Sequence, residues 1–252
     1  MLRSRHGHAS TRARQCVDPR DDRNSLQAPQ SAANSEADMQ SSSITPKVCI
    51  LAGSPRKNGN TASLLRPFSE ALEQRGAAVE RIRLHEKTVK PCIACRTCQN
   101  IPDAFGCPYD DDMQSVFLSV LAADCLILAC PIYSWYCTAP MKAVLDRLVY
   151  GMNKYYGKIQ GLSLWKDKTA ALFLTCGYRI ENAVSPFRTG MINYCRHSKL
   201  RYAGMFAARD RGYAVPFMTE EKAAGAADFA RRLHDRLITR DTDAEPISVS
   251  IE

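Results

Sequence analysis

The sequence contains no hydrophobic run long enough to cross a membrane, so we expect no membrane span. It also lacks the fingerprints G-x-x-x-x-G-K-[ST] and G-x-G-x-x-G, which disfavours binding of a nucleoside triphosphate or a Rossmann dinucleotide. The net charge of +8 is spread over segments of mixed sign, so it favours an anionic small ligand, or mere solubility, over nucleic acid. Basic and aromatic residues also do not interleave on one element. The start of the chain has no apolar segment typical of a secretory signal, and we expect a cytoplasmic protein.

Large apolar residues are scarce over residues 1–45, where Arg, Asp, Ser, Gln and Ala dominate. Such a segment cannot bury enough surface to offset chain entropy, so we predict a disordered N-terminal extension. Residues 46–240 form the predicted ligand-binding domain, and the overall hydrophobic content of 45% is sufficient for its core. The polar residues 241–252 are expected to form a frayed tail.

Apolar runs and amphipathic segments alternate through the predicted domain. The expected strands are 47–52, 79–84, 124–130, 168–175 and 199–207. The expected helices are 62–75, one capped by residues 110–112 that runs to 122, 139–150, 183–196 and 219–238. This alternation predicts an α/β fold with a doubly wound, five-stranded parallel sheet and helices on both faces. Ligands of such sheets bind beyond the carboxyl ends of the strands, so the loops after the first, third and fourth strands are candidates.

The loop after the first strand has the composition of a phosphate-binding site. Residues 52–61 read AGSPRKNGNT and connect a buried strand to a helix N-terminus, whose free amides and dipole attract anions. The glycines permit close approach of the backbone. The candidate hydrogen-bond donors are Ser54, Arg56, Asn58, Asn60 and Thr61. The alternative interpretation is an ordinary strand-to-helix turn.

The loops after the third and fourth strands have the composition of a site for a flat ligand. Residues 131–137 read PIYSWYC, and three aromatic side chains at the mouth of a sheet are costly to expose. A flat apolar ligand or a partner subunit would cover them, or they pack on a neighbouring helix. Residues 175–178 read TCGY, and their small side chains permit close approach of a planar ring.

Together these loops resemble those of the flavodoxin-like NAD(P)H-dependent FMN reductases. The match is to G-S-P-R-x-x-G-N-T at 53–61, P-x-Y at 131–133 and A-P-M-K-x-x-x-D-R at 139–147, and the resemblance extends from 47 to about 207. It implies an FMN-containing oxidoreductase with NAD(P)H as co-substrate and no catalytic side chain, because hydride transfer to the flavin needs no general acid. It implies phosphate contacts from Ser54, Arg56, Asn60 and Thr61. It also implies that the flavin ring is lined by Pro131, Ile132, Tyr133, Ser134, Trp135, Thr175 and Gly177.

The loop at residues 90–109 is rich in cysteine. Cys92, Cys95 and Cys98 have C-x2-C-x2-C spacing, and Cys107 follows after eight residues. Short spacing lets several thiolates converge on one iron–sulfur cluster. The loop resembles that of the iron-sulfur flavoproteins, a branch of the same fold, which implies that these four cysteines bind a [4Fe-4S] cluster. A structural zinc site, a disulfide or redox-sensing pair, and a loop that binds nothing remain open.

Most of the other cysteines are expected to pack as small core residues: Cys49, Cys125, Cys130, Cys137, Cys176 and Cys195. The family resemblance implies a homodimer or homotetramer. The aromatic residues expected to be buried between subunits are Trp135, Tyr136, Tyr155, Tyr156 and Trp165.

Three functions compete at this point. The first is an iron-sulfur flavoprotein that moves electrons between NAD(P)H or ferredoxin, FMN and a [4Fe-4S] cluster. The second is a metal-free or zinc-bearing FMN-dependent reductase of quinones, azo or nitro compounds. The third is a non-enzymatic electron carrier resembling flavodoxin, which the basic charge and the cysteine loop disfavour. The partner is a small molecule or a redox protein, with no nucleic acid and no membrane.

Overall fold

The computed structural model describes residues 45–241 and 244–252, so the predicted N-terminal extension lies outside the described residues apart from its last position. The strands are β1 (Lys47–Ala52), β2 (Ala78–Arg83), β3 (Cys125–Pro131), β4 (Thr169–Cys176), β5 (Arg201–Arg209) and β6 (Ile247–Ile251). The helices are α1 (Asn60–Glu73), α2 (Met113–Ala122), α3 (Ala139–Met152), α4 (Ile180–Ser198) and α5 (Glu220–Thr239). Two 3-10 helices, η1 (Leu84–Glu86) and η2 (Thr97–Asn100), lie between β2 and α2. Among the described residues, no helix has the length and apolarity needed to cross a membrane.

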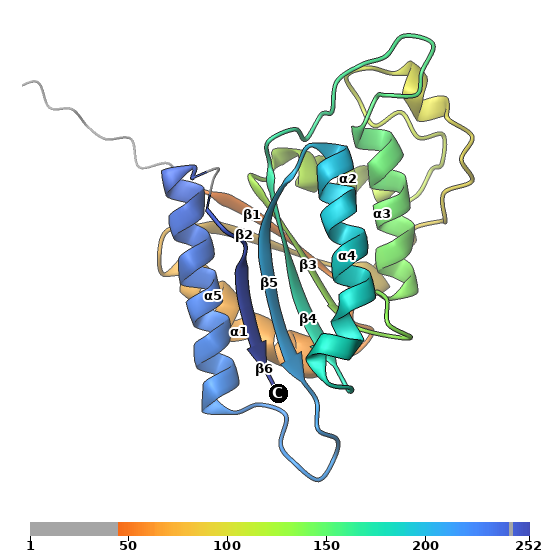
Figure 1. The fold of residues 1–252 in the computed structure, drawn as a ribbon. Coiled ribbons are helices and arrows are strands. Elements are labelled where there is room, and N and C mark those ends of the chain that lie inside the picture. Colours follow the sequence, from red (N-terminus) through yellow and green to blue (C-terminus); the bar gives the residue numbers. More distant parts are fainter. Residues whose placement is uncertain (1–44, 242–243) are drawn as a thin grey trace, which may run out of the picture. The chain divides into compact units, whose positions relative to one another are not determined.

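The strands form one sheet with the order β2-β1-β3-β4-β5-β6, in which all neighbouring pairs are parallel (Figure 1). The predicted doubly wound parallel sheet is confirmed, with one strand more than expected. The frayed tail predicted for residues 241–252 is wrong over 247–251, which pair with β5. Ile247 and Ile251 are buried, so an alternating polar and apolar pattern forms an edge strand once β5 is available as its partner.

The sheet has an apolar core on each face. Helices α1 and α5 cover one face, and α2, α3 and α4 cover the other (Figure 1). Side chains of the central strand β3 alternate between the two cores, with Cys125, Ile127 and Ala129 on one side and Leu126, Leu128 and Cys130 on the other. The cysteines predicted to be core residues are all buried.

Two helices begin earlier than the sequence predicted, and in each case a distant residue holds the first turn. Helix α1 begins at Asn60, where the buried Thr61 hydroxyl lies 2.8 Å from the Thr175 hydroxyl. Helix α4 begins at Ile180, whose amide donates to the Glu252 carboxylate at 3.0 Å. The local pattern does not contain these partners.

Trp165 is fully buried within the chain, so its predicted place in a subunit interface is wrong. Its indole Nε1 donates to Asn153 Oδ1 at 2.9 Å, and its ring packs edge-on against Tyr194. A buried indole with its N–H satisfied is a core residue.

Candidate functional site

The structure brings together the three loops selected from the sequence, at the carboxyl edge of the sheet. The Thr138 hydroxyl donates to the carbonyl of Gly53 at 2.8 Å, which ties the start of α3 to the loop after β1. The Ile132 amide donates to the carbonyl of Thr175 at 2.8 Å, which joins the ends of β3 and β4. With the contact between Thr61 and Thr175, these bonds make the three loops one structural unit.

The loop between β1 and α1 has the features of a phosphate site. Gly59 is the N-cap of α1 and provides no side-chain acceptor, so the first-turn amides are left for a ligand or solvent. A Cβ at Gly59 would lie 2.8 Å from the Arg56 Cβ, and a Cβ at Gly53 would lie 2.9 Å from the Thr138 Oγ1. Both glycines are therefore required by close packing. A small pocket beside this turn is lined by Ser54, Arg56, Thr61, Arg81 and Arg83, among others. This donor set fits a phosphate monoester.

Two of the predicted phosphate residues lie differently from the others. Asn60 donates from its side-chain amide to Asp210 Oδ2 at 2.7 Å, and Asp210 follows β5. The Asp210 carboxylate also accepts from the Gly212 amide at 3.0 Å. Asn58 is exposed in the turn and does not line the small pocket. Asn60 thus connects the loop after β5 to the site, and sequence reasoning missed Asp210 because a lone acid after a strand carries no motif.

The loop after β3 is a tight turn with unusual backbone geometry. The amides of Tyr133 and Tyr136 each donate to the other's carbonyl at 2.9 Å. Between them, Ser134 and Trp135 have φ angles of 47° and 64°, a left-handed conformation that costs free energy for residues other than glycine. Trp135 stacks on Tyr178, which follows β4, with ring centroids 5.9 Å apart and planes 10° apart.

The aromatic residues of this turn differ in their packing. Tyr136 packs edge-on against Phe187 of α4, as the helix-packing alternative predicted. Tyr133 and Trp135 remain about half exposed at the mouth of the sheet, at 49% and 51%. Two aromatic faces are therefore open to a flat ligand or a partner.

The remaining ring-lining candidates occupy the ends of two neighbouring strands. Pro131 is the last residue of β3 and pairs in register with Thr175 of β4, and Ile132 follows it. At Gly177 a Cβ would meet nothing within 4 Å, so the residue borders open space. These positions give a planar group room beside the phosphate turn.

The cysteine-rich loop lies between β2 and α2, beside the C-terminal end of α3 (Figure 1). The Gln99 side chain of η2 donates to the carbonyls of Tyr150 and Asn153, at 2.5 and 2.8 Å. Cys92, Cys95, Cys98 and Cys107 line one pocket, together with side chains that include Phe105, Tyr109, Arg147 and Tyr150. The four predicted ligands therefore face a common space.

Three of these sulfurs accept hydrogen bonds. Cys92 Sγ accepts from the Ala94 amide at 3.4 Å, Cys95 Sγ from the Thr97 hydroxyl at 3.4 Å, and Cys107 Sγ from Arg147 Nη2 at 3.1 Å. The hydrogen bond from Thr97 lowers the pKa of the Cys95 thiol, whereas burial raises the pKa of Cys98. The ten described cysteines are free thiols. Among the described residues, no three His, Cys, Asp or Glu side chains converge tightly enough to hold a metal ion. Four soft sulfurs, three of them with hydrogen-bond donors, nonetheless fit an iron–sulfur cluster or zinc in chemistry.

Two buried cations support this loop, and sequence reasoning assigned neither a role. The side chains of Arg147 and Asp111 are each 1% exposed and form an ion pair at 2.5 Å. Lys154 Nζ donates to the carbonyls of Cys98 and Ala104, at 2.9 and 2.6 Å. Burial lowers the pKa of Lys154. The sequence singles out Arg147 as the last residue of the A-P-M-K-x-x-x-D-R segment, but it does not indicate that this side chain contacts the cysteine loop.

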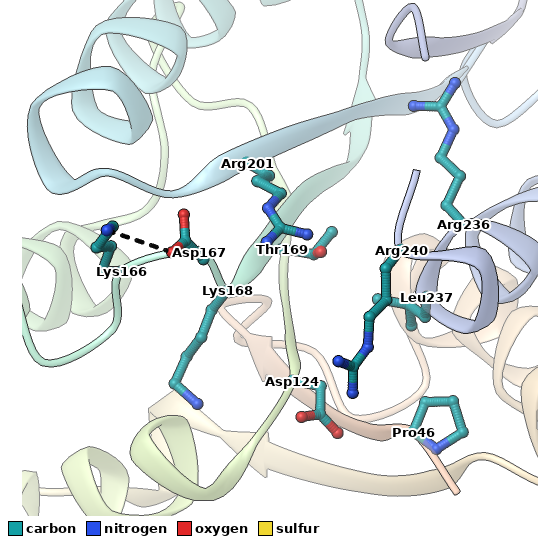
Figure 2. A pocket seen from close by; sticks show the side chains of 10 residues that line it. All are labelled: Pro46, Asp124, Lys166, Asp167, Lys168, Thr169, Arg201, Arg236, Leu237 and Arg240. Atoms are coloured by element: carbon teal, nitrogen blue, oxygen red, sulfur yellow. Dashed lines mark ion pairs between the residues drawn. The ribbon is translucent and has the colours of Figure 1, made fainter. Parts of the chain in front are cut away.

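A separate cleft lies at the opposite, amino edge of the sheet, and Figure 2 shows it. Two of its basic residues have structural roles: Lys168 Nζ donates to the Ala123 carbonyl, and Arg236 donates to the Ala203 carbonyl. Arg236 and Arg240 lie at the C-terminal end of α5, where cations offset the helix dipole. The fold thus accounts for much of the positive charge of this cleft, and the loops at the carboxyl edge remain the candidate site.

The sequence model of the family described as NADPH-dependent FMN reductase matches residues 46–191, which is more than half of the chain. The chain belongs to this family. The resemblance predicted from the three loops is thus confirmed, and the matched segment includes the phosphate turn, the aromatic turn and the cysteine loop.

Two curated relatives of this member of the FMN reductase family carry the name iron-sulfur flavoprotein. One, from Methanocaldococcus jannaschii, is 36% identical over 101 residues, which are 40% of this chain and 51% of that protein. Another, from Methanosarcina thermophila, is 34% identical over 110 residues, or 44% of this chain and 56% of that protein. The chain spans about half the length of the curated relatives it matches.

Solved structures share the fold at low sequence identity. An NAD(P)H:quinone oxidoreductase from Methanothermobacter marburgensis superimposes with a TM-score of 0.58 at 18% identity, over 81% of this chain and 100% of that chain. An FMN-dependent NADH-azoreductase from Bacillus anthracis gives 0.54 at 14% identity, over 76% of this chain and 99% of that chain. At these identities the likeness concerns the fold alone.

Proposed function

We propose that this protein is an FMN-dependent oxidoreductase of the iron-sulfur flavoprotein type, which moves electrons between NAD(P)H or a ferredoxin, FMN and a [4Fe-4S] cluster. The observation that carries the flavin part is the uncapped N-terminus of α1, which lies at the same sheet edge as the ends of β3 and β4. An anion site beside two half-exposed aromatic faces suits a phosphate linked to a flat ring.

In this proposal the residues of the first loop bind the phosphate. The first-turn amides of α1 and the side chains of Ser54, Arg56 and Thr61 donate to its oxygens. The turn at 131–135 and the segment 175–177 hold the ring and exclude water from its faces. When bound, FMN supplies the redox chemistry, and the protein contributes binding, orientation and hydrogen bonds.

The cluster part of the proposal rests on the four cysteines that line one pocket. The names of the curated relatives, iron-sulfur flavoprotein, support it. Cys92, Cys95, Cys98 and Cys107 would bind the irons as thiolates, and the hydrogen bonds to three of the sulfurs would favour the thiolate form.

We also propose a homodimer or homotetramer. Thr138, which contacts the phosphate turn, and Tyr150, which lines the cysteine pocket, are twelve residues apart on α3, or roughly 18 Å at the usual rise. A second copy that brings its cysteine pocket to the mouth of the sheet would shorten the path for electrons between the two sites. Exposed Trp135 and Tyr156 offer apolar surface for a second copy. Light scattering at micromolar concentration tests this, and a monomer would refute it.

The full chain, purified without oxygen, tests the function. We expect bound FMN and about four irons and four sulfides per chain. NADH, NADPH and reduced ferredoxin are then offered separately, and bleaching of the flavin absorbance identifies the donor. Flavin without iron would refute the cluster and leave a metal-free reductase of quinones, azo or nitro compounds. A protein that fails to take up added FMN would refute the whole proposal.

A further inference from the structure

Arg147 contacts a cysteine sulfur from a fully buried position. Its Nη2 donates to Cys107 Sγ at 3.1 Å, and its Nη1 donates to Asp111 Oδ2 at 2.5 Å and to the Lys90 carbonyl at 3.4 Å. The guanidinium also lies over the Tyr109 ring, 5.2 Å from its centroid. The Arg147 Nε is buried and has no hydrogen-bond partner in the part of the chain that the structure describes. The side chain is therefore fixed with one arm on the carboxylate and the other on the sulfur.

The ion pair with Asp111 does not by itself explain this arrangement. A carboxylate can engage both arms of a guanidinium, yet here the second arm is used by the sulfur. A neutral thiol is a weak acceptor, whereas a thiolate that binds a metal is a strong one. Lys154 is also buried beside this loop, with its Nζ on the Cys98 carbonyl, so two buried cations and one buried carboxylate lie close to the cysteines. That excess of cations suits an anionic group held by four thiolates.

We propose that Arg147 is a positioning residue for the cluster: its hydrogen bond fixes Cys107 as the fourth ligand and raises the cluster's reduction potential. This inference rests on the proposed function. The eight residues between Cys98 and Cys107 would otherwise leave the Cys107 sulfur free to move, and the buried guanidinium removes that freedom. A hydrogen bond and a positive charge at a ligand sulfur both favour the form of the cluster with one more negative charge, which is the reduced form.

The test uses the full chain in four forms: wild type, Arg147→Met, Arg147→Lys and the matched control Lys154→Met. Lys154 is the other buried cation of the loop, and within the described residues its hydrogen bonds go to carbonyl oxygens and to no sulfur. Each protein is purified without oxygen and assayed for FMN, iron and sulfide. The cluster is then titrated by electron paramagnetic resonance, and electron–nuclear double resonance in H2O and D2O counts the exchangeable protons coupled to it.

In R147M we expect the equilibrium constant for one-electron reduction of the cluster to fall at least tenfold, a shift of about 59 mV to lower potential. One exchangeable proton coupling should disappear in R147M and remain in K154M, because Arg147 donates to a cysteine sulfur and Lys154 donates to carbonyl oxygens. A complete R147M cluster with the wild-type potential and all its couplings would overturn the inference and leave the proposed function intact.

If R147M contains no cluster, the R147K variant tests the inference instead. A lysine that restores the iron content together with the exchangeable coupling supports the inference, whereas full iron and the wild-type potential without that coupling overturns it. Wild-type protein that contains FMN but no iron or sulfide would refute the cluster and this inference together.

Discussion

Thr61 and Thr175 share a hydrogen bond of 2.8 Å between their hydroxyl oxygens, although 114 positions separate them in the chain. Both residues are buried. The bond joins the first turn of α1 to the end of β4, so the phosphate turn and a ring-lining loop are held in one geometry. The candidate site is thus fixed by a contact that spans nearly half of the sequence.

Substitution of Thr61 by Val should destabilise the fold by about 1–3 kcal/mol, because the buried Thr175 hydroxyl loses its partner. Urea unfolding of T61V, T175V and the double variant measures this. The double variant should lose less free energy of unfolding than the two single variants lose together, since both partners are then apolar. Strict additivity would show that the two hydroxyls do not interact.

Arg56→Ala should weaken FMN binding by about 1.5–3 kcal/mol, or roughly 10- to 150-fold in Kd, because a charged donor to the phosphate is lost. Titration of the apoprotein with FMN, followed by quenching of flavin fluorescence, gives the constant. Lys57→Ala is the matched control, since Lys57 lies next to Arg56 and pairs with Glu86 at 3.1 Å. Equal affinities for R56A and wild type would mean that Arg56 does not bind the phosphate.

Ile247→Ala should lower the free energy of unfolding by about 2–5 kcal/mol, because this β6 side chain is only 1% exposed. Ser248→Ala, at an exposed position of the same strand, should change stability by less than about 0.5 kcal/mol. Chemical denaturation compares the two variants. Equal stabilities would indicate that residues 247–251 do not form a strand in solution.

Asp111 should make stability depend on pH in the acid range. Burial alone would raise the pKa of Asp111, but the hydrogen bonds that it accepts from Arg147, and from the Lys90 and Met113 amides, lower it below its ordinary value of 3.8. A lowered pKa in the folded state gives stability that is present above pH 3.8 and is lost as pH falls through the folded-state pKa.

Asp111→Asn provides the comparison for this pH dependence. Urea midpoints between pH 2 and 6 should show wild type more stable than D111N above about pH 4, with the difference shrinking at lower pH. A difference that is constant over this range would refute the role of the Asp111 charge.

The local sequence was sufficient for the elements whose structure depends on neighbouring residues. The run 124–130 predicts a strand buried on both faces, and the glycine-rich turn at 53–61 predicts that a helix follows the first strand. The A-P-M-K segment predicts the start of α3 at Ala139, which the structure has. These patterns act over a few residues and do not depend on distant partners.

Other features depended on the tertiary structure alone. Ile247–Ile251 becomes a strand because β5 offers an edge, and Trp165 is buried because Asn153 accepts from its indole. The Asn60 side chain donates a hydrogen bond to Asp210, 150 positions away in the chain, and Arg147 donates to Cys107, 40 positions away. Composition and spacing show that such side chains need partners, but only the path of the folded chain decides which partners lie within hydrogen-bond distance.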